Sequence, residues 1–243
     1  MYFDSESNTA DLRYFTWLVV LAQVFGALAV VLVGVWMGHF QGGFAWQSDP
    51  DHQFNYHPLF MVIGMIFLYA DGILAYRVFR NDKKLYIKIL HAAMHTVALV
   101  FAAVGLKAVF DSHNLTDKPN LYTLHSWIGL FVVVAFGVQW LLGFLAFVTP
   151  VAGIVIKRYY MPYHRFWGVT LLALAGATAL LGITENAVWK VWKVAPYSGP
   201  EDILVNFLGI SIIAFVVLVI YLVTKADYRR PPAPEEDHIQ LAE

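Results

Sequence analysis

Six apolar stretches, each long enough to cross a lipid bilayer as a helix, constrain this chain more than any other feature. A bilayer crossing needs about 20 predominantly apolar residues. The chain is 59% hydrophobic and only 14% charged, whereas a soluble domain carries about 25% charged residues. The sequence therefore predicts an all-α membrane protein with six transmembrane helices. The stretches cover residues 15–38, 57–76, 87–110, 122–148, 163–185 and 203–224.

The crossings form one predicted domain, residues 15–224, with a short segment on either side. Residues 1–14 are acidic and polar, unlike the basic start of a cleaved signal peptide, so we expect the first apolar stretch to direct membrane insertion. Residues 225–243 are rich in proline and acidic residues, which predicts a disordered tail. No internal repeat and no second domain are evident.

The distribution of Lys and Arg predicts the orientation of the chain. Six crossings place both termini on one side of the membrane, and twelve of the sixteen Lys and Arg residues belong to segments on that side. Positive residues favour the cytosolic side, so both termini are predicted to be cytosolic. The net charge of −1 gives no reason to expect a nucleic-acid partner.

Histidine recurs at the start of each of the four central stretches, at His57, His91, His125 and His164. Because consecutive helices run antiparallel, His57 and His125 are predicted at the non-cytosolic face. The other two belong at the cytosolic face, where His95 lies one helical turn beyond His91. Position alone therefore pairs His57 with His125, and either His91 or His95 with His164.

Two imidazoles on facing helices are the ligands expected for the iron of a b-type haem in a helical bundle. Two such pairs predict two non-covalent b-type haems, one towards each face. The chain has no cysteine, which excludes thiolate metal sites and covalent c-type haem. Zinc needs three or four protein ligands, and two histidines per level fall short. Taken singly, each histidine could also be a half-hydrated side chain at a helix end, but ionisable groups inside a membrane usually serve a function.

From about residue 36 to residue 230 the sequence resembles the cytochrome b-561 family of transmembrane ascorbate-dependent reductases, most closely the animal chromaffin-granule type. The resemblance implies six spans and two haems. It assigns His57 and His125 to the non-cytosolic haem, and His91 and His164 to the cytosolic one. His95 is then expected to pack as a neutral core residue or to hydrogen-bond a backbone carbonyl. The motifs that carry the resemblance are, in order, "GGFAWQSD", "FNYHPL", "YRVFRN", "ILHAAMH", "VFDSHN", "LYTLHSW" and "MPYH".

Basic residues beside the cytosolic pair predict a landing site for a small anion. Lys84 and Lys88 share a helical face that leads to His91, and Lys157 and Arg158 precede the histidine of the fifth stretch. Topology alone would also explain this positive charge. The resemblance implies an ascorbate site made by Lys84, Lys88, Arg158 and Arg77, with Lys157 a weaker candidate.

At the non-cytosolic face the resemblance implies a substrate site that contains His113 and Tyr122, although a histidine in a "DSHN" turn is usually only solvated. Asp71 stands where the granule type has asparagine. Its carboxyl either shifts the potential of the cytosolic haem or has no measurable effect.

These features together predict electron transfer from cytosolic ascorbate to a non-cytosolic acceptor, either monodehydroascorbate, which would regenerate ascorbate inside a vesicle, or a ferric chelate. The expected setting is a secretory vesicle or another endomembrane, and a homodimer is compatible with the sequence. Two other functions stay open. A histidine-based proton or metal transporter would need an aqueous path, and a structural scaffold would tolerate loss of all four histidines.

Overall fold

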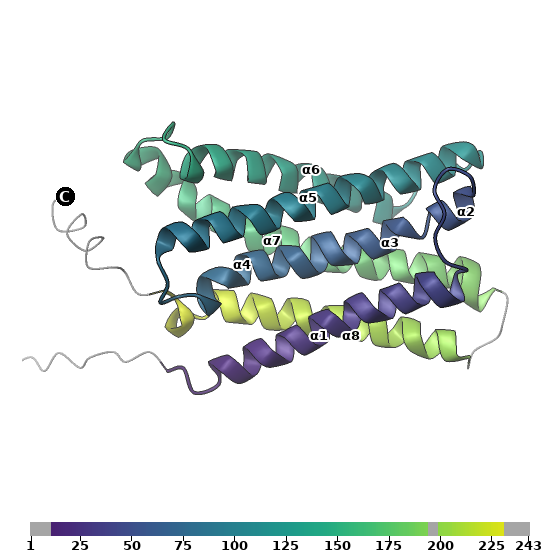
Figure 1. Ribbon diagram of the computed structural model, residues 1–243, viewed down its shortest axis with the longest axis horizontal. Helices are drawn as coiled ribbons and strands as arrows, with labels where there is room; N and C mark the ends of the chain where they lie inside the picture. Colours follow the sequence, from purple (N-terminus) through teal and green to yellow (C-terminus); the bar gives the residue numbers. More distant parts are fainter. Residues whose placement is uncertain (1–10, 194–198, 231–243) are drawn as a thin grey trace, which may run out of the picture.

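The computed structural model describes residues 11–193 and 199–230, and this part of the chain is helical without strands. It contains six helices long and apolar enough to cross a membrane, arranged lengthwise in one bundle (Figure 1). The prediction of an all-α membrane protein with six transmembrane helices is therefore confirmed. The elements are α1 (Phe15–Val35), η1 (Trp36–Phe40), α2 (Pro50–Gln53), α3 (Tyr56–Met61), η2 (Val62–Leu68), α4 (Tyr69–Val78), α5 (Lys84–Leu115), α6 (Leu124–Gly143), η3 (Phe144–Val148), α7 (Ile154–Asn186), η4 (Ala187–Trp192), α8 (Pro200–Thr224) and η5 (Ala226–Tyr228).

Most helices extend beyond the apolar stretches that predict them. Helix α5 begins at Lys84 and α7 at Ile154, several residues before hydropathy alone would start them. Polar side chains can continue a helix once it has left the hydrocarbon, because the backbone hydrogen bonds do not depend on apolar side chains. The predicted substrate residues Lys84, Lys88 and Arg158 therefore all lie within the first five residues of spanning helices.

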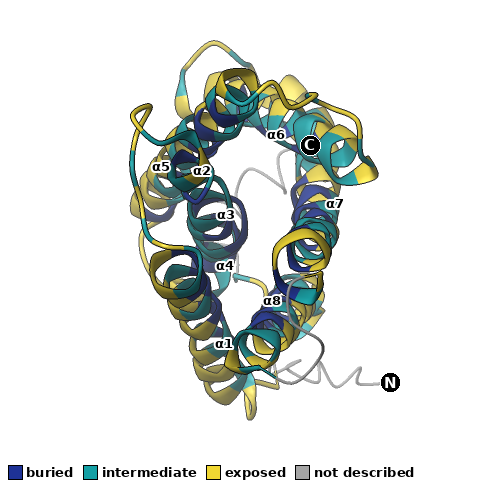
Figure 2. Ribbon diagram, turned by 90° about the vertical axis from the view of Figure 1, so that its right-hand side faces the viewer, coloured by how far each residue is buried: buried dark blue, intermediate teal, exposed yellow. Residues whose placement is uncertain are grey.

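The described chain begins and ends at the same end of the bundle, as six crossings require (Figure 1). We call this the termini end and the other the opposite end. Viewed along the bundle, the helices form a closed ring in which α1 and α8 lie at one pole and α5 and α6 towards the other (Figure 2). Exposed residues face outwards all round the ring and the buried ones face inwards.

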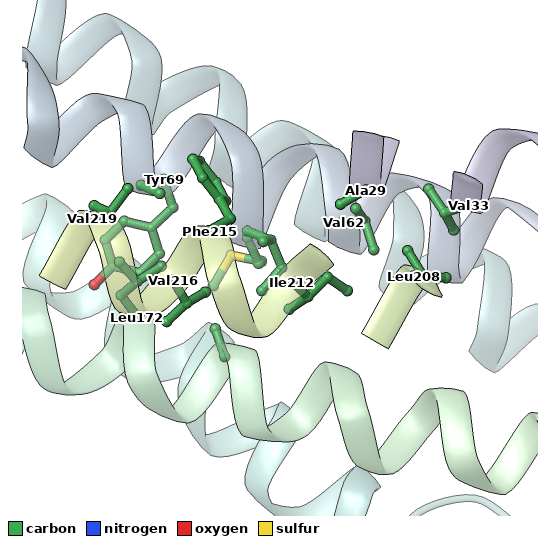
Figure 3. Packing of buried hydrophobic residues seen from close by; sticks show 14 of the residues in the cluster. Ala29, Val33, Val62, Tyr69, Leu172, Leu208, Ile212, Phe215, Val216 and Val219 are labelled. Carbon is green, nitrogen blue, oxygen red and sulfur yellow. The ribbon is translucent and has the colours of Figure 1, made fainter. Parts of the chain in front are cut away.

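Helices α1 and α8 pack extensively against each other, and buried side chains of η2 join the same apolar cluster. Ile212 and Phe215 of α8 are completely buried in this cluster, against Ala29 of α1 and Val62 of η2 (Figure 3). A Cβ atom at Gly26 would lie 2.9 Å from Phe67 and 3.0 Å from Phe215, so only glycine fits there. Small residues of this kind allow membrane helices to approach closely. Helices α1 and α8 thus brace one side of the bundle, and the four central spans carry the histidines.

Polar contacts fix the register of the helices at both ends. At the opposite end, Glu201 accepts hydrogen bonds from Trp36 Nε1 at 2.8 Å and from Gln41 Nε2 at 2.6 Å. At the termini end, the Arg77 guanidinium donates to the carbonyl of Val223 near the end of α8. Each bond joins segments far apart in sequence and satisfies a polar group that is partly shielded from water.

Ordered structure continues into the segment predicted to be a disordered tail from residue 225. Residues 226–228 form a helical turn whose Tyr228 is buried, with its ring centre 5.0 Å from that of Phe15. This contact closes the termini end between α1 and α8. Most of the predicted segment 1–14, and residues 231–243 of the tail with His238, lie outside the described residues.

Candidate functional site

The structure brings the four helix-start histidines together as two facing pairs. At the opposite end, the ring centres of His57 on α3 and His125 on α6 are 6.0 Å apart. At the termini end, those of His91 on α5 and His164 on α7 are 6.2 Å apart. A metal–imidazole bond of about 2 Å, with about 1.2 Å from nitrogen to ring centre, puts two rings on opposite sides of one iron about 6.4 Å apart. Each pair therefore has the spacing that one haem iron requires.

Backbone carbonyls orient three of the four rings. The Nδ1 atoms lie close to carbonyl oxygens: His91 at 2.8 Å from Gly72, His125 at 2.9 Å from Thr178 and His57 at 3.3 Å from Gly105. A carbonyl can only accept, so Nδ1 carries the proton and the lone pair is left on Nε2, as a metal ligand needs. The Nδ1 of His164 is buried and has no hydrogen-bond partner in the described part of the chain.

Glycines on neighbouring helices make room for two of these rings. A Cβ atom at Gly182 would lie 2.5 Å from Cε1 of His125, and one at Gly143 would lie 3.0 Å from Cε1 of His164. Any larger side chain would push the ring away from its partner. The importance of these two positions is not visible in the sequence, because glycine also packs membrane helices generally.

The two pairs are separated by about 20 Å along the bundle. Gly72, which orients His91, follows His57 by 15 residues, which corresponds to about 22 Å of helix. On α7, Thr178 follows His164 by 14 residues, or about 21 Å. The pairs thus lie at two levels within a bilayer core of about 30 Å.

His95 packs behind the termini-end pair instead of joining it. The residue is 7% exposed, and its ring lies 4.3 Å from that of His91, 5.3 Å from that of Tyr69 and 5.6 Å from that of Phe136, measured between ring centres. Its Nδ1 has no hydrogen-bond partner among the residues that the structure describes. Of the two roles considered from the sequence, this geometry favours the neutral, packed imidazole.

The basic residues of the candidate ascorbate site lie at the termini end, on several helices. Lys88 on α5 donates to the carbonyl of Phe147 at 3.0 Å and so reaches η3. Arg77 instead turns towards α8, where it bonds Val223, and has Arg80, Arg165 and Arg229 as electrostatic neighbours. Lys84 is the first residue of α5 and Arg158 is the fifth residue of α7.

At the opposite end, a largely apolar cavity contains His57, His125, His113 and Tyr122. His113 belongs to the last turn of α5 rather than to a loop, and its ring is stacked on that of Phe54, 6.3 Å away at an interplanar angle of 10°. Tyr122 stacks on Trp189, with ring centres 6.3 Å apart. The cavity thus connects the deep histidine pair with two residues of the predicted substrate site.

Sequence reasoning did not single out Phe54 and Trp189 as part of this region. Phe54 precedes His57 by three residues, so the two share a helical face, and their ring centres are 6.0 Å apart. That spacing could have identified Phe54. Nothing in the sequence indicates that Trp189, at the end of the fifth span, contacts Tyr122 at the start of the fourth span.

Asp71 contacts α1. Its Oδ1 accepts a hydrogen bond from Gln23 Nε2 at 2.7 Å, across the contact between α1 and α4. Asparagine could accept the same bond, so the contact explains how the carboxyl is accommodated. Its influence on a haem potential stays a prediction.

The fold and the histidines define a class of protein: a multi-pass helical membrane protein with a pair of facing imidazoles near each end. That arrangement is typical of a membrane cytochrome with b-type haem. Within residues 11–193 and 199–230, no group of three or more His, Cys, Asp or Glu residues could hold a bare metal ion.

The chain belongs to the cytochrome b561 family. Residues 56–190 match the family model described as eukaryotic cytochrome b561. The chain is 41% identical over 237 residues to the putative transmembrane ascorbate-dependent reductase CYB561 homolog of Caenorhabditis elegans, covering 93% of this chain and 89% of that protein. It is 44% identical to the transmembrane ascorbate-dependent reductase CYB561 of Homo sapiens, covering 92% and 88%. It is 39% identical to the plasma membrane ascorbate-dependent reductase CYBRD1 of Xenopus tropicalis, covering 92% and 80%.

Membership in this family implies a b-type haem cofactor. The residues present fit it: the pairs have iron-ligand spacing, three Nδ1 hydrogen bonds leave the lone pair on Nε2, and glycines make room for two of the rings. The number of haems and the ligand assignment remain predictions.

The glycines beside the rings provide a test that leaves every histidine in place. Gly182→Ala should disturb the opposite-end pair and Gly143→Ala the termini-end pair, each with an overpacking cost of about 1–3 kcal/mol. Visible spectra and thermal unfolding of the purified variants measure both effects. Gly34→Ala is the matched control, since a Cβ atom there meets nothing within 4 Å. Equal behaviour of all three variants would contradict the proposed role of these glycines.

Single substitutions distinguish His91 from His95. His91→Ala should lose one haem equivalent and reduction by ascorbate, because its partner ring would face no second ligand. His95→Gln should keep both haems and shift at most the potential of one, because its ring packs behind the pair. Haem content and a redox titration measure these outcomes. Retention of both haems by His91→Ala together with loss of one by His95→Gln would reverse the assignment.

Proposed function

We propose that this chain transfers electrons across a membrane, from cytosolic ascorbate through two bis-histidine b haems to an acceptor on the non-cytosolic side. The observation that carries the proposal is the presence of two imidazole pairs at iron-ligand spacing, one towards each end of the same bundle. A single pair, or two pairs at one level, would not connect the two faces of a membrane.

A b haem bound by two imidazoles has no open coordination position and therefore exchanges single electrons. The chain provides the geometry around it. Carbonyl contacts hold three rings with the lone pair left on Nε2, and mostly apolar side chains line the cavity at the His57–His125 pair. Fixed ligands also limit the rearrangement that accompanies a change of charge.

The donor side is proposed to be the termini end. Positive residues are concentrated there, as expected for a cytosolic face. Lys84, Lys88 and Arg158 begin the two helices that bring His91 and His164 together, so an anion attracted to them would come close to that pair. Arg77 contributes to the positive field from α4. The names of the relatives, which include ascorbate-dependent reductases, support ascorbate as that anion.

The acceptor side is then the opposite end, where His113 and Tyr122 share a cavity with His57 and His125. We propose monodehydroascorbate as the acceptor, which would regenerate ascorbate inside a secretory vesicle or another endomembrane compartment. A ferric chelate is the alternative acceptor, and a homodimer remains compatible with the fold. A metal transporter is the weaker interpretation, because no group of three or more His, Cys, Asp or Glu residues in the described part of the chain is placed to hold a metal ion.

Neutralising the proposed donor site tests this function. In the Lys84→Ala, Lys88→Ala, Arg158→Ala triple variant, the ascorbate concentration for half-maximal haem reduction should rise roughly tenfold, because three weak charge interactions are lost. The visible spectrum should stay unchanged. In the unmodified protein, half-saturation should also rise with salt. Stopped-flow reduction of protein in oriented vesicles measures both effects.

The control removes the same charge from the opposite end, as Lys107→Ala, Lys118→Ala, Lys193→Ala, and should leave the ascorbate dependence unchanged. If the two triple variants behave alike, the basic residues only set topology. Should ascorbate reduce the protein from the side remote from the termini, the proposed direction is wrong.

A further inference from the structure

We propose that Lys190 binds the anionic electron acceptor at the rim of the opposite-end cavity, holding it against Phe54 beside His113. The inference rests on the proposed function and adds a recognition residue to it. The ligand class is a small anion that accepts one electron, such as an organic oxyanion radical or an anionic ferric chelate. For each electron entering from ascorbate, one reaches the bound acceptor.

The position of Lys190 follows from the end of the fifth span. The segment η4 carries Lys190 directly after Trp189, the residue that stacks on Tyr122. Lys190 Nζ lies 5.2 Å from the centre of the Phe54 ring, within the range of a cation–π contact. The contact holds the ammonium group over one particular ring, although the residue itself is exposed to the outside.

Phe54 connects this ammonium group to the inner residues. Its ring is parallel to that of His113, with centres 6.3 Å apart, and its centre is 6.0 Å from that of His57. A molecule held by Lys190 at the edge of Phe54 would therefore be close to His113. The Phe54 ring also lies next to His57, a member of the opposite-end histidine pair. An anion bound at this position would therefore be held by the Lys190 charge and would lie close to the pair that supplies the electron.

The charges around Lys190 leave it able to attract an external anion. In the described part of the chain it forms no salt bridge, and the acids whose charge reaches it are Asp51 and Glu201. Asp51 is paired with Lys118 at 3.1 Å. Glu201 already accepts two hydrogen bonds, from Trp36 and Gln41. Neither carboxylate forms a direct ion pair that a ligand would have to displace.

Glu185 limits where the anion can bind. Its side chain lines the cavity and accepts a hydrogen bond from Thr123 Oγ1 at 3.2 Å. A carboxylate inside the cavity repels an anion, while the ammonium group at the rim attracts it. The acceptor is therefore placed at the rim, and removal of the Glu185 charge should strengthen its binding.

The test compares Lys190→Gln with Lys193→Gln, which removes the same charge three residues away. Proteoliposomes with ascorbate on the termini side receive ferricyanide, an anion, or hexaammineruthenium(III), a cation, on the other side. For Lys190→Gln, the half-saturating ferricyanide concentration should rise about fivefold at an unchanged maximal rate, and the effect should shrink with salt. Lys193→Gln should stay within about twofold of the unmodified protein. With hexaammineruthenium(III) as acceptor, Lys190→Gln should have a half-saturating concentration equal to or lower than that of the unmodified protein.

A binding measurement that involves no electron transfer accompanies the kinetics. Hexacyanocobaltate(III) has the charge and shape of ferricyanide but is redox-inert, and titration calorimetry gives its affinity for the holoprotein. Lys190→Gln should weaken it, Lys190→Arg should retain it, and Glu185→Gln should strengthen it. The spectrum and thermal unfolding of each variant establish that the fold is intact.

Equal effects of Lys190→Gln and Lys193→Gln would overturn the inference, as would equal losses with the anionic and the cationic acceptor. A loss in Lys190→Arg as large as that in Lys190→Gln would show that the charge is not what binds. If ascorbate fails to reduce the unmodified protein, the proposed function fails, whereas hexacyanocobaltate binding still decides the role of Lys190.

Discussion

The structure depends on holding imidazole rings inside an apolar bundle, three of them with Nδ1 hydrogen-bonded to a backbone carbonyl. A buried polar group without a partner costs several kcal/mol in hydrocarbon, about 2–7 depending on the reference state. Carbonyls of neighbouring helices meet this cost for His57, His91 and His125, and the same bonds leave the lone pair of each ring on Nε2. The stabilisation of the fold and the preparation of an iron site are therefore one set of contacts, as expected for ionisable groups retained within a membrane.

The remaining helices make that arrangement possible. Helices α1 and α8 pack together through small residues and close one side of the ring. Hydrogen bonds between helices, such as those that Glu201 accepts, fix the register of these outer helices. The central spans can then carry glycines opposite histidine rings without loss of the bundle. The two ends differ in chemistry: lysine and arginine are concentrated at the termini end, and stacked aromatic rings surround a cavity at the opposite end. This asymmetry is the basis for the proposed direction of electron flow.

Much of this could be predicted from the sequence, because hydropathy and the recurrence of histidine are local signals. The six spans and the facing of His57 with His125 follow from helix length and antiparallel order. The same reasoning places either His91 or His95 opposite His164, and only the family resemblance selects His91. The contacts of Gly182 with His125 and of Lys190 with Phe54 join residues on different helices. They depend on the rotation of each helix about its axis, which packing determines. The ordered turn at Tyr228 was missed for the same reason, since only its contact with Phe15 makes it part of the bundle.

The central claim is that each histidine pair holds one non-covalent haem. The most direct measurement is haem content per chain by acid–acetone extraction and pyridine haemochrome analysis, for the unmodified protein and for His57→Ala and His164→Ala. We predict two equivalents of extractable b-type haem in the unmodified protein and one in each variant, with a different component of the spectrum lost in the two variants. One equivalent in the unmodified protein, a pigment that stays with the polypeptide, or loss of the same spectral component in both variants would contradict the account.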